Sequence, residues 1–351
     1  MIDSVSRLVA LGWGPFFQQQ LTLEDLETYR PARVFEVQRS GLTLLHEGGE
    51  STVSLAGRWF QLDAEERPTV GDWVLLNETL DNVQRVLERK SLLKRLSAGR
   101  ESEIQLIGAN VDTMFLVSSC NDEFNLGRME RYLSLAFDAG VQPVVVLTKA
   151  DLCDDSENYL AEVKRLRGDL VVELVNALDL ASLGNVAVWV QPGQTIVLLG
   201  SSGVGKSTLL NTLSGLNLQV TKDIRGDDSK GRHTTSHRSL HLLPEGGLVL
   251  DSPGIRELSL AEAESGVLRM FDDIEALAGE CRFSDCVHES EPDCAVRAAI
   301  ASGDLEERRL ASYRKLAREE AHNTESVAER HARFRQFSKV VRLHMAHKKR
   351  D

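Results

Sequence analysis

The chain has 351 residues, of which 42% are hydrophobic and 27% charged, a composition typical of folded globular proteins and of a length that predicts two or three domains. No apolar run is long enough to cross a membrane, and the amino terminus lacks a signal-peptide pattern, so we expect a cytoplasmic protein. The odd number of cysteines, five, argues against a secreted disulfide scaffold, and the net charge of −12 against general nucleic-acid binding, although basic residues cluster locally.

The first hundred residues divide into an extension, 1–30, and a region of short strands, 31–100. The extension contains apolar stretches that predict short helices or a docking arm, and we assign no chemistry to it. Five strands separated by turn residues favour a small closed barrel, of the OB or SH3-like type. The predicted strands cover residues 32–37, 42–45, 52–55, 73–76 and 83–87. Such barrels often bind RNA, and a purely structural barrel is the alternative.

The basic stretch 85–100 closes this region and carries six cations against one acid. A solvated linker explains it as well as an RNA contact does.

A second domain, 101–266, opens with buried strands at 111–117 and 143–148 and a helical stretch, 128–139, between them. This order predicts a parallel, right-handed unit. The second strand runs into Thr148, Lys149, Ala150 and Asp151. Ligands bind at this end of parallel strands, where a carboxylate can accept hydrogen bonds from the N1–H and N2–H₂ groups of guanine and a lysine stem can lie along the base. An ordinary helix N-cap at Asp151 is the alternative.

The most informative stretch is a glycine loop that follows the apolar run 195–199 and precedes an apolar helical pattern at 209–213. Strand, loop and helix in this order identify a phosphate-binding loop, in which backbone N–H groups converge on phosphate oxygens. Lys206 would reach the β- and γ-phosphates and Ser207 would hold Mg²⁺; a structural glycine turn is the alternative. The loop comprises Gly200, Ser201, Ser202, Gly203, Val204, Gly205, Lys206, Ser207 and Thr208.

Two further motifs follow the phosphate loop. The polar segment 222–238 resembles a mobile switch loop, with Thr234 or Thr235 available to cover Mg²⁺ and the γ-phosphate. The run 247–254 predicts a buried strand that ends in Asp-x-x-Gly, with Asp251 near Mg²⁺ and the Gly254 N–H near the γ-phosphate. Since the guanine motif precedes the phosphate loop instead of following Asp-x-x-Gly, the order predicts a circularly permuted GTPase.

The position after Asp-x-x-Gly bears on catalysis. Many GTPases carry a water-orienting glutamine there, whereas this chain has Ile255, so intrinsic hydrolysis should be slow. His233, in the predicted switch loop, is the nearby polar residue that could orient the water. The alternative is that His233 packs or contacts RNA.

The last region, 267–351, contains Cys281, Cys286, His288 and Cys294 within fourteen residues. Three thiolates and one imidazole suit a closed, tetrahedral structural zinc site, and a disulfide plus a spare thiol is the alternative. Helical patterns follow at 295–303 and 305–320. The tail from 330 to 350 has eight lysines and arginines and no acid, which suits contact with nucleic-acid phosphates or a solvated helix face.

Taken together, these motifs resemble the ribosome small subunit-dependent GTPase A family over roughly residues 31–300. The resemblance implies an N-terminal OB-fold, a circularly permuted α/β GTPase domain and a mostly helical zinc domain. It implies a monomer that binds GTP with Mg²⁺, the 30S ribosomal subunit and its 16S rRNA, with subunit-stimulated hydrolysis in late subunit maturation. Thr148 departs from the usual asparagine, which removes an amide that can bond the base and should weaken affinity. Asn176 replaces the usual serine, while Ala177, whose N–H would meet guanine O6, is retained.

Two alternatives come from other classes. The sequence of the loop also suits an ABC-type ATPase, but the signature motif is absent and the residue after Asp251 is Ser252, not an acid. A non-catalytic RNA-binding scaffold with a vestigial nucleotide site is the second.

Overall fold

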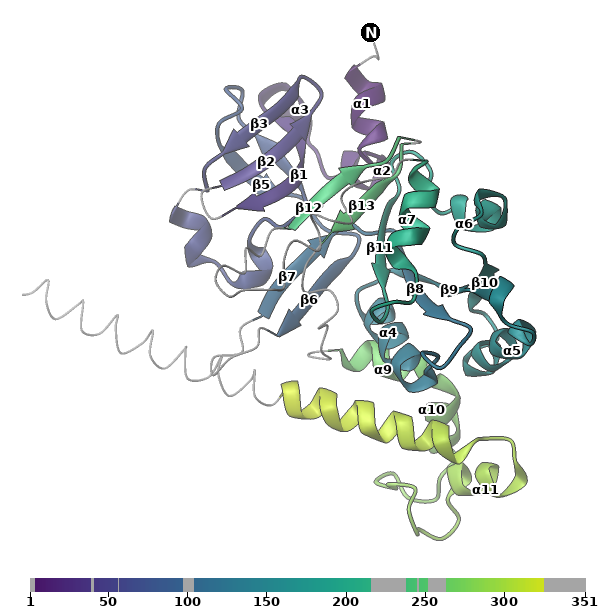
Figure 1. Ribbon diagram of the computed structural model, residues 1–351. Helices are drawn as coiled ribbons and strands as arrows, with labels where there is room; N and C mark the ends of the chain where they lie inside the picture. Colours follow the sequence, from purple (N-terminus) through teal and green to yellow (C-terminus); the bar gives the residue numbers. More distant parts are fainter. Residues whose placement is uncertain are drawn as a thin grey trace, which may run out of the picture. The chain divides into compact units, whose positions relative to one another are not determined.

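The computed structural model describes residues 4–38, 41–55, 57–96, 104–215, 238–244, 246–251 and 263–324. The chain forms two compact units, one of residues 1–95 and 104–258 and one of residues 96–103 and 259–351 (Figure 1). Among the helices of the described ranges, none combines the length and the apolar character that a membrane span requires.

Three short helices begin the first unit: α1 (Ser4–Ala10), α2 (Pro15–Gln18) and α3 (Leu23–Thr28). The Thr22 hydroxyl accepts the Asp25 N–H and the Asp25 carboxylate accepts the Thr22 N–H, and this reciprocal cap fixes the start of α3. Buried apolar side chains from this segment pack against the strands that follow: Leu8, Leu11 and Phe17 share one cluster with Trp73, Leu75 and Leu87. The extension is therefore helical and contributes to a core.

Five antiparallel strands follow, at all the positions that the turn signals predict. They are β1 (Arg30–Gln38), β2 (Gly41–His46), β3 (Gly49–Val53), β4 (Trp73–Leu76) and β5 (Val83–Val86). Their order is β3-β2-β1-β4-β5, with the short helices η1 (Gly57–Gln61) and η2 (Ala64–Glu66) between β3 and β4. Alternate apolar side chains of these strands form one buried cluster, as the period of two along a strand requires.

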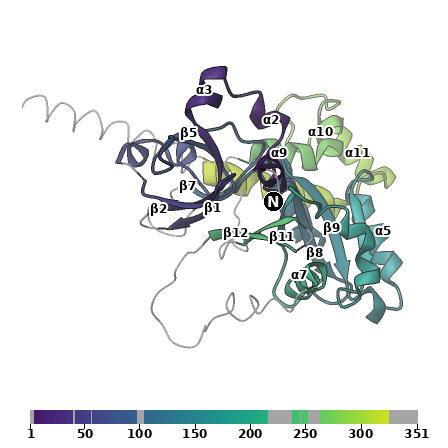
Figure 2. The same ribbon diagram turned by 90° about the horizontal axis from the view of Figure 1, so that it is seen from above.

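The larger sheet of the first unit has the order β10-β9-β8-β11-β13-β12, and all neighbours are parallel except β12 and β13 (Figures 1 and 2). Its strands are β8 (Thr113–Ser119), β9 (Gln142–Thr148), β10 (Val171–Val175), β11 (Thr195–Leu199), β12 (Arg238–Leu242) and β13 (Leu248–Asp251). The short elements between them are α4 (Leu126–Asp138), η3 (Ala150–Leu152), α5 (Ser156–Leu166), η4 (Leu180–Leu183), α6 (Gly184–Ala187) and α7 (Lys206–Ser214). The predicted strand–helix–strand unit at 111–148 is confirmed.

Strand pairing between β1 and β12 joins the two sheets into one of eleven strands. Elsewhere on β1, Arg33 is fully buried and adds a side-chain link to the start of β11. Its guanidinium donates to the carbonyl oxygens of Leu11, Gly71 (3.3 Å) and Asn110 (3.1 Å) and to the Thr195 hydroxyl (2.7 Å). Burial lowers its pKa to about 10. We call this set of five residues the Arg33 seam.

The basic stretch 85–100 contains the end of β5 and the whole of β6 (Leu92–Leu96), which pairs with β7 (Ile104–Ala109). Two of its cations, Arg89 and Lys94, have acidic partners inside the protein. Arg89 forms two 2.7 Å bonds with the buried carboxylate of Asp72, and Lys94 lies 2.9 Å from Glu65. Structural contacts thus account for these charges better than a solvated linker does.

The second unit is helical in its described part, with α9 (Glu264–Met270), α10 (Asp272–Ala278), α11 (Ala295–Ser302) and a helix over 307–324. Arg309, on the last helix, forms bonds of 2.6 and 2.7 Å with the Asp273 carboxylate, and the Tyr313 hydroxyl donates to Glu275 at 2.6 Å. These contacts fasten the last helix to α10, and both helical patterns predicted here are confirmed.

Candidate functional site

The glycine loop lies between the central strand β11 and helix α7, as the sequence predicts. Gly200 has φ 151°, and a Cβ atom there would lie 2.1 Å from the carbonyl oxygen of Val117 on β8. Gly205 has φ 95° and caps α7. Only glycine fits both the close approach and the positive φ angles, so the sequence pattern follows from the backbone path.

Positive charge is concentrated in this loop. The Lys206 ammonium donates to the carbonyl oxygens of Gly200, at 2.7 Å, and of Ser201. Ser207 and Thr208 lie in the first turn of the nine-residue helix α7, whose N-terminal N–H groups face the loop. Lysine, helix dipole and backbone N–H groups together make the loop suited to an anion such as a phosphate.

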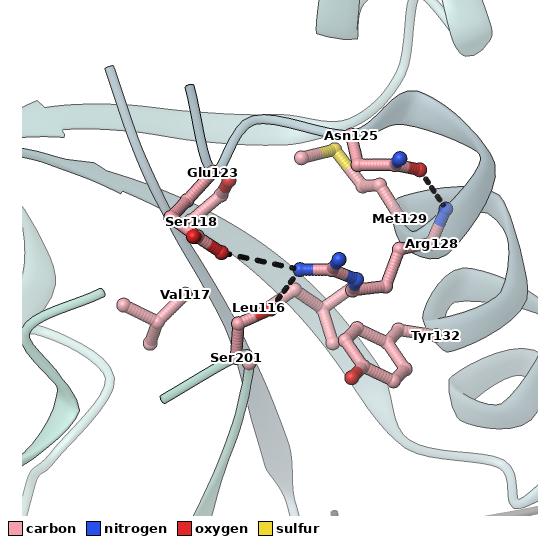
Figure 3. Close-up of a pocket in the computed structure, with 10 residues that line it drawn as sticks. Leu116, Val117, Ser118, Glu123, Asn125, Arg128, Met129, Tyr132 and Ser201 are labelled. Carbon is pink, nitrogen blue, oxygen red and sulfur yellow. Dashed lines mark hydrogen bonds and ion pairs between the residues drawn. The ribbon is translucent and has the colours of Figure 1, made fainter. Parts of the chain in front are cut away.

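A pocket beside the loop brings in a cation that sequence reasoning missed. Figure 3 shows the Arg128 guanidinium directed from α4 toward Ser201, to whose hydroxyl it donates. The same guanidinium lies 3.9 Å from the Glu123 carboxylate, and Asn125 caps the helix by accepting the Arg128 N–H at 2.8 Å. No motif marks Arg128 because its contact joins residues 73 positions apart.

The predicted guanine motif lies at the carboxyl end of β9. Thr148 is its last residue, Lys149 has a left-handed φ of 59°, and Asp151 lies inside η3 with an exposed carboxylate. Because the cap of η3 is Lys149, the interpretation of Asp151 as a helix N-cap does not hold. Ala150, between them, opens η3.

Thr148 and Ala177 connect the neighbouring loops to the phosphate loop and its helix. The Thr148 hydroxyl oxygen lies 2.6 Å from the Val204 carbonyl oxygen. The Ala177 carbonyl accepts a 2.7 Å bond from the Thr212 hydroxyl on α7, and Asn176 accepts the Leu178 N–H at 2.9 Å. The 148–151 motif, the 176–178 loop and the phosphate loop therefore follow strands of one sheet and lie at its carboxyl edge.

Asp251 is the last residue of β13, which runs parallel to β11, so it lies at the same edge. The other predicted catalytic positions, His233, Thr234, Thr235 and Gly254, lie outside the described residues, as does the basic tail. The structure thus brings together four of the predicted elements: the guanine motif, Ala177, the phosphate loop and Asp251.

The second unit contains a cluster of Cys281, Cys286, His288 and Cys294, whose ligand atoms all lie within 4.8 Å of one another. The Sγ atoms of Cys281 and Cys294 are 3.8 Å apart, and they lie 3.6 and 3.5 Å from His288 Nδ1. A tetrahedral zinc site with Zn–S of about 2.3 Å and Zn–N of about 2.0 Å has edges of about 3.8 and about 3.5 Å. These separations fit a metal and exceed the roughly 2.05 Å of a disulfide; all five cysteines are free thiols.

Residues outside the ligand set shape this loop. The Glu291 carboxylate accepts the N–H groups of Val287 (3.0 Å), Glu289 (2.8 Å) and Ser290 (3.1 Å), which lower its pKa to about 2. Burial lowers the pKa of His288, which favours the neutral imidazole that a metal ligand requires. The Glu291 contacts could not be predicted from the sequence, since an acid among several neighbouring acids has no distinctive spacing.

Comparison with known proteins supplies the context. Residues 86–261 match the family model described as RsgA GTPase. A protein of Vibrio parahaemolyticus named small ribosomal subunit biogenesis GTPase RsgA 2 is 50% identical, covering 100% of this chain and 96% of the relative. The crystal structure of YjeQ from Thermotoga maritima has 25% identity and a TM-score of 0.62, over 82% of this chain and 97% of that one. YloQ, described as a circularly permuted GTPase, has 26% identity and a TM-score of 0.57, over 82% and 93%.

Proposed function

Because the chain belongs to the RsgA GTPase family and is a GTP hydrolase, we propose that it acts in biogenesis of the small ribosomal subunit, a role that the names of its relatives give to those proteins. The observation that carries this proposal is the convergence of the phosphate loop, the 148–151 motif and Asp251 at one sheet edge. Circular permutation explains how motifs in this unusual chain order share one site.

For the nucleotide, we assign a role to each motif. Lys206 and the loop N–H groups bind the phosphates, and the Ser207 hydroxyl holds Mg²⁺, which would neutralise charge developing on the phosphates when bound. Asp151 accepts the guanine N1–H and N2–H₂ hydrogens, Ala177 offers its N–H to O6, and Asp251 lies on the Mg²⁺ side. Exposure of the Asp151 carboxylate supports this role, because a base can reach it.

For catalysis, we assign Thr234 or Thr235 and the Gly254 N–H to the γ-phosphate, and water orientation to His233. The isoleucine after Asp-x-x-Gly supports a stimulated enzyme, because an aliphatic side chain cannot orient the attacking water. Replacing His233 by alanine should then leave GTP binding intact and remove most of the stimulation by small subunits.

For RNA, we propose that the N-terminal strands form an OB-fold that contacts 16S rRNA. Strand order supports this, since β1 pairs with both β2 and β4, and β3 and β5 stand at the two ends of the order. A barrel of the OB type closes by bringing those two end strands together. We also propose that the protein acts as a cytoplasmic monomer.

For the metal, we propose one structural zinc ion per chain, held by Cys281, Cys286, His288 and Cys294. The tetrahedral separations support it. Elemental analysis should find about one zinc per chain, and Cys286→Ala should lose the metal and destabilise the second unit while sparing GTP binding. A zinc-free yet equally stable wild type would contradict this assignment.

Membership of the RsgA GTPase family and the missing ABC signature motif disfavour the ABC-type ATPase alternative. The same family membership disfavours a non-catalytic scaffold with a vestigial nucleotide site. The decisive experiment measures phosphate release from GTP with and without purified 30S subunits. We expect slow phosphate release from the protein alone and strong stimulation by 30S subunits, with 50S subunits as the control.

Asp151→Asn should lose its preference for GTP and bind xanthosine triphosphate instead, whose C2 carbonyl can accept the new amide hydrogens. Absence of stimulation, or retained GTP preference in that variant, would contradict the proposal.

A further inference from the structure

Thr148 occupies the first position of the guanine motif, and its side chain is fully buried. The hydroxyl oxygen lies 2.6 Å from the Val204 carbonyl oxygen in the phosphate loop and 3.1 Å from the Ser118 carbonyl oxygen on β8. Its own carbonyl accepts the Cys120 N–H at 3.0 Å. Thr148 therefore touches the ends of two strands and the phosphate loop at once.

Packing reinforces this link. A Cβ atom at Gly205 would lie 3.5 Å from the Thr148 hydroxyl oxygen and 3.7 Å from its methyl carbon, so the loop backbone lies directly against the threonine. The contact joins the strand that leads into Asp151 to the loop that leads into Lys206.

The number of donor hydrogens decides what else this side chain can do. A hydroxyl has one hydrogen, and both neighbouring groups are carbonyls, which only accept. The single hydrogen is therefore used on the Val204 or the Ser118 oxygen. Guanine N7 is also only an acceptor, so Thr148 has no hydrogen left for it. An asparagine amide has two, one for the loop and one for the base.

We propose, resting on the proposed guanine site, that Thr148 is a positioning and specificity-determining residue. Its hydroxyl holds the phosphate loop against the end of β9, the strand that leads into Asp151, and makes no hydrogen bond with purine N7. This differs from a simple loss of base affinity. The missing amide removes one contact with the base, but the hydroxyl retains the contact with the loop. Guanine is then recognised through the edge that faces Asp151 and through O6, while changes at N7 are tolerated.

The test compares GTP, ATP and 7-deaza-GTP, in which a C–H group replaces N7, as competitors of a fluorescent GDP on the full-length protein. We expect GTP and 7-deaza-GTP to bind within about twofold of each other, because a neutral hydrogen bond is otherwise worth about two- to tenfold. Binding of GTP at least fivefold tighter than 7-deaza-GTP would overturn the inference. If GTP and ATP bound equally, the proposed guanine site itself would fail instead.

Three variants separate the two roles of Thr148. Thr148→Val removes the hydroxyl at constant shape and should weaken GTP and 7-deaza-GTP alike by about tenfold, since a loop carbonyl loses its donor. Thr148→Ser should recover most of that loss. Thr148→Asn adds a second donor and should favour GTP over 7-deaza-GTP by about three- to tenfold. Equal GTP binding by the valine variant would overturn the positioning role, and the wild-type comparison stands even if the asparagine variant does not fold.

Discussion

The two ends of strand β11 are held in opposite ways. At its start, Thr195 belongs to the Arg33 seam, in which one buried cation satisfies four oxygen atoms from distant segments. At its other end, Gly200 turns into the phosphate loop because it has no side chain and can approach β8. One end depends on the presence of a side chain and the other on the absence of one. We therefore expect the Arg33 seam to govern stability and Gly200 to govern nucleotide binding.

The largest expected effect is at the seam. Arg33→Met should lower the free energy of unfolding by about 3–5 kcal/mol, because four oxygen atoms each lose a buried donor, although the Gly71 carbonyl keeps a 3.0 Å bond from the Asn110 amide. Urea unfolding followed by circular dichroism measures this. Arg165→Met, on the exposed side of α5, is the matched control and should change stability by less than about 0.5 kcal/mol. A loss below about 1 kcal/mol for the seam variant would mean that the seam is dispensable.

The next effect is at the loop. Gly200→Ala should weaken GTP binding by about 100-fold or more, since its Cβ would lie 2.1 Å from a backbone oxygen and β8 or the loop must move. Gly203→Ala is the matched control: its φ is also positive, at 83°, but no atom lies within 4 Å of the added Cβ. Strain alone, about 1–2 kcal/mol, predicts a loss of about five- to thirtyfold. Equal losses in equilibrium binding measurements would show that close packing at Gly200 is unimportant.

The smallest expected effect is at Arg128, and its variants test whether this side chain also supports the phosphate loop. Arg128→Ala should weaken GTP binding by about two- to fivefold, because Ser201 loses a hydrogen bond that is half exposed. Ser201→Ala should have a similar effect. If the contact between them is responsible, the double variant should be no worse than either single one. Additive losses would assign the two residues independent roles.

The difference between the two ends also explains what the sequence could predict. The phosphate loop, the strands around it and the cysteine cluster are local patterns, because a tight turn or a metal site needs particular residues at fixed spacing. The five antiparallel strands were predictable from alternation and turn residues for the same reason. Asp151 at the sheet edge followed from the rule for parallel strands.

Contacts between distant segments were not predictable. Arg33 looks like any basic residue of a strand until Leu11, Gly71, Asn110 and Thr195 are brought around it by the fold. The roles of Arg128 beside Ser201 and of Thr148 against Val204 depend on chain crossings of the same kind. The substitution at Thr148 was visible as a missing amide, but its retained contact with the loop required three-dimensional placement.

The pairing of β1 with β12 also has a consequence for the order in which the protein is made. It joins Glu36 to Ser239 and Val37 to Arg238, partners about 200 residues apart along the chain. At a translation rate of about 5–20 residues per second, β1 waits roughly 10–40 seconds for this partner. Within the described residues of β1 and β12 two residue pairs are involved, so the edge that is temporarily open there is short and offers little surface for aggregation. The N-terminal strands can therefore fold on the nascent chain while the larger sheet is still being synthesised, and joining the two sheets is a late step of folding.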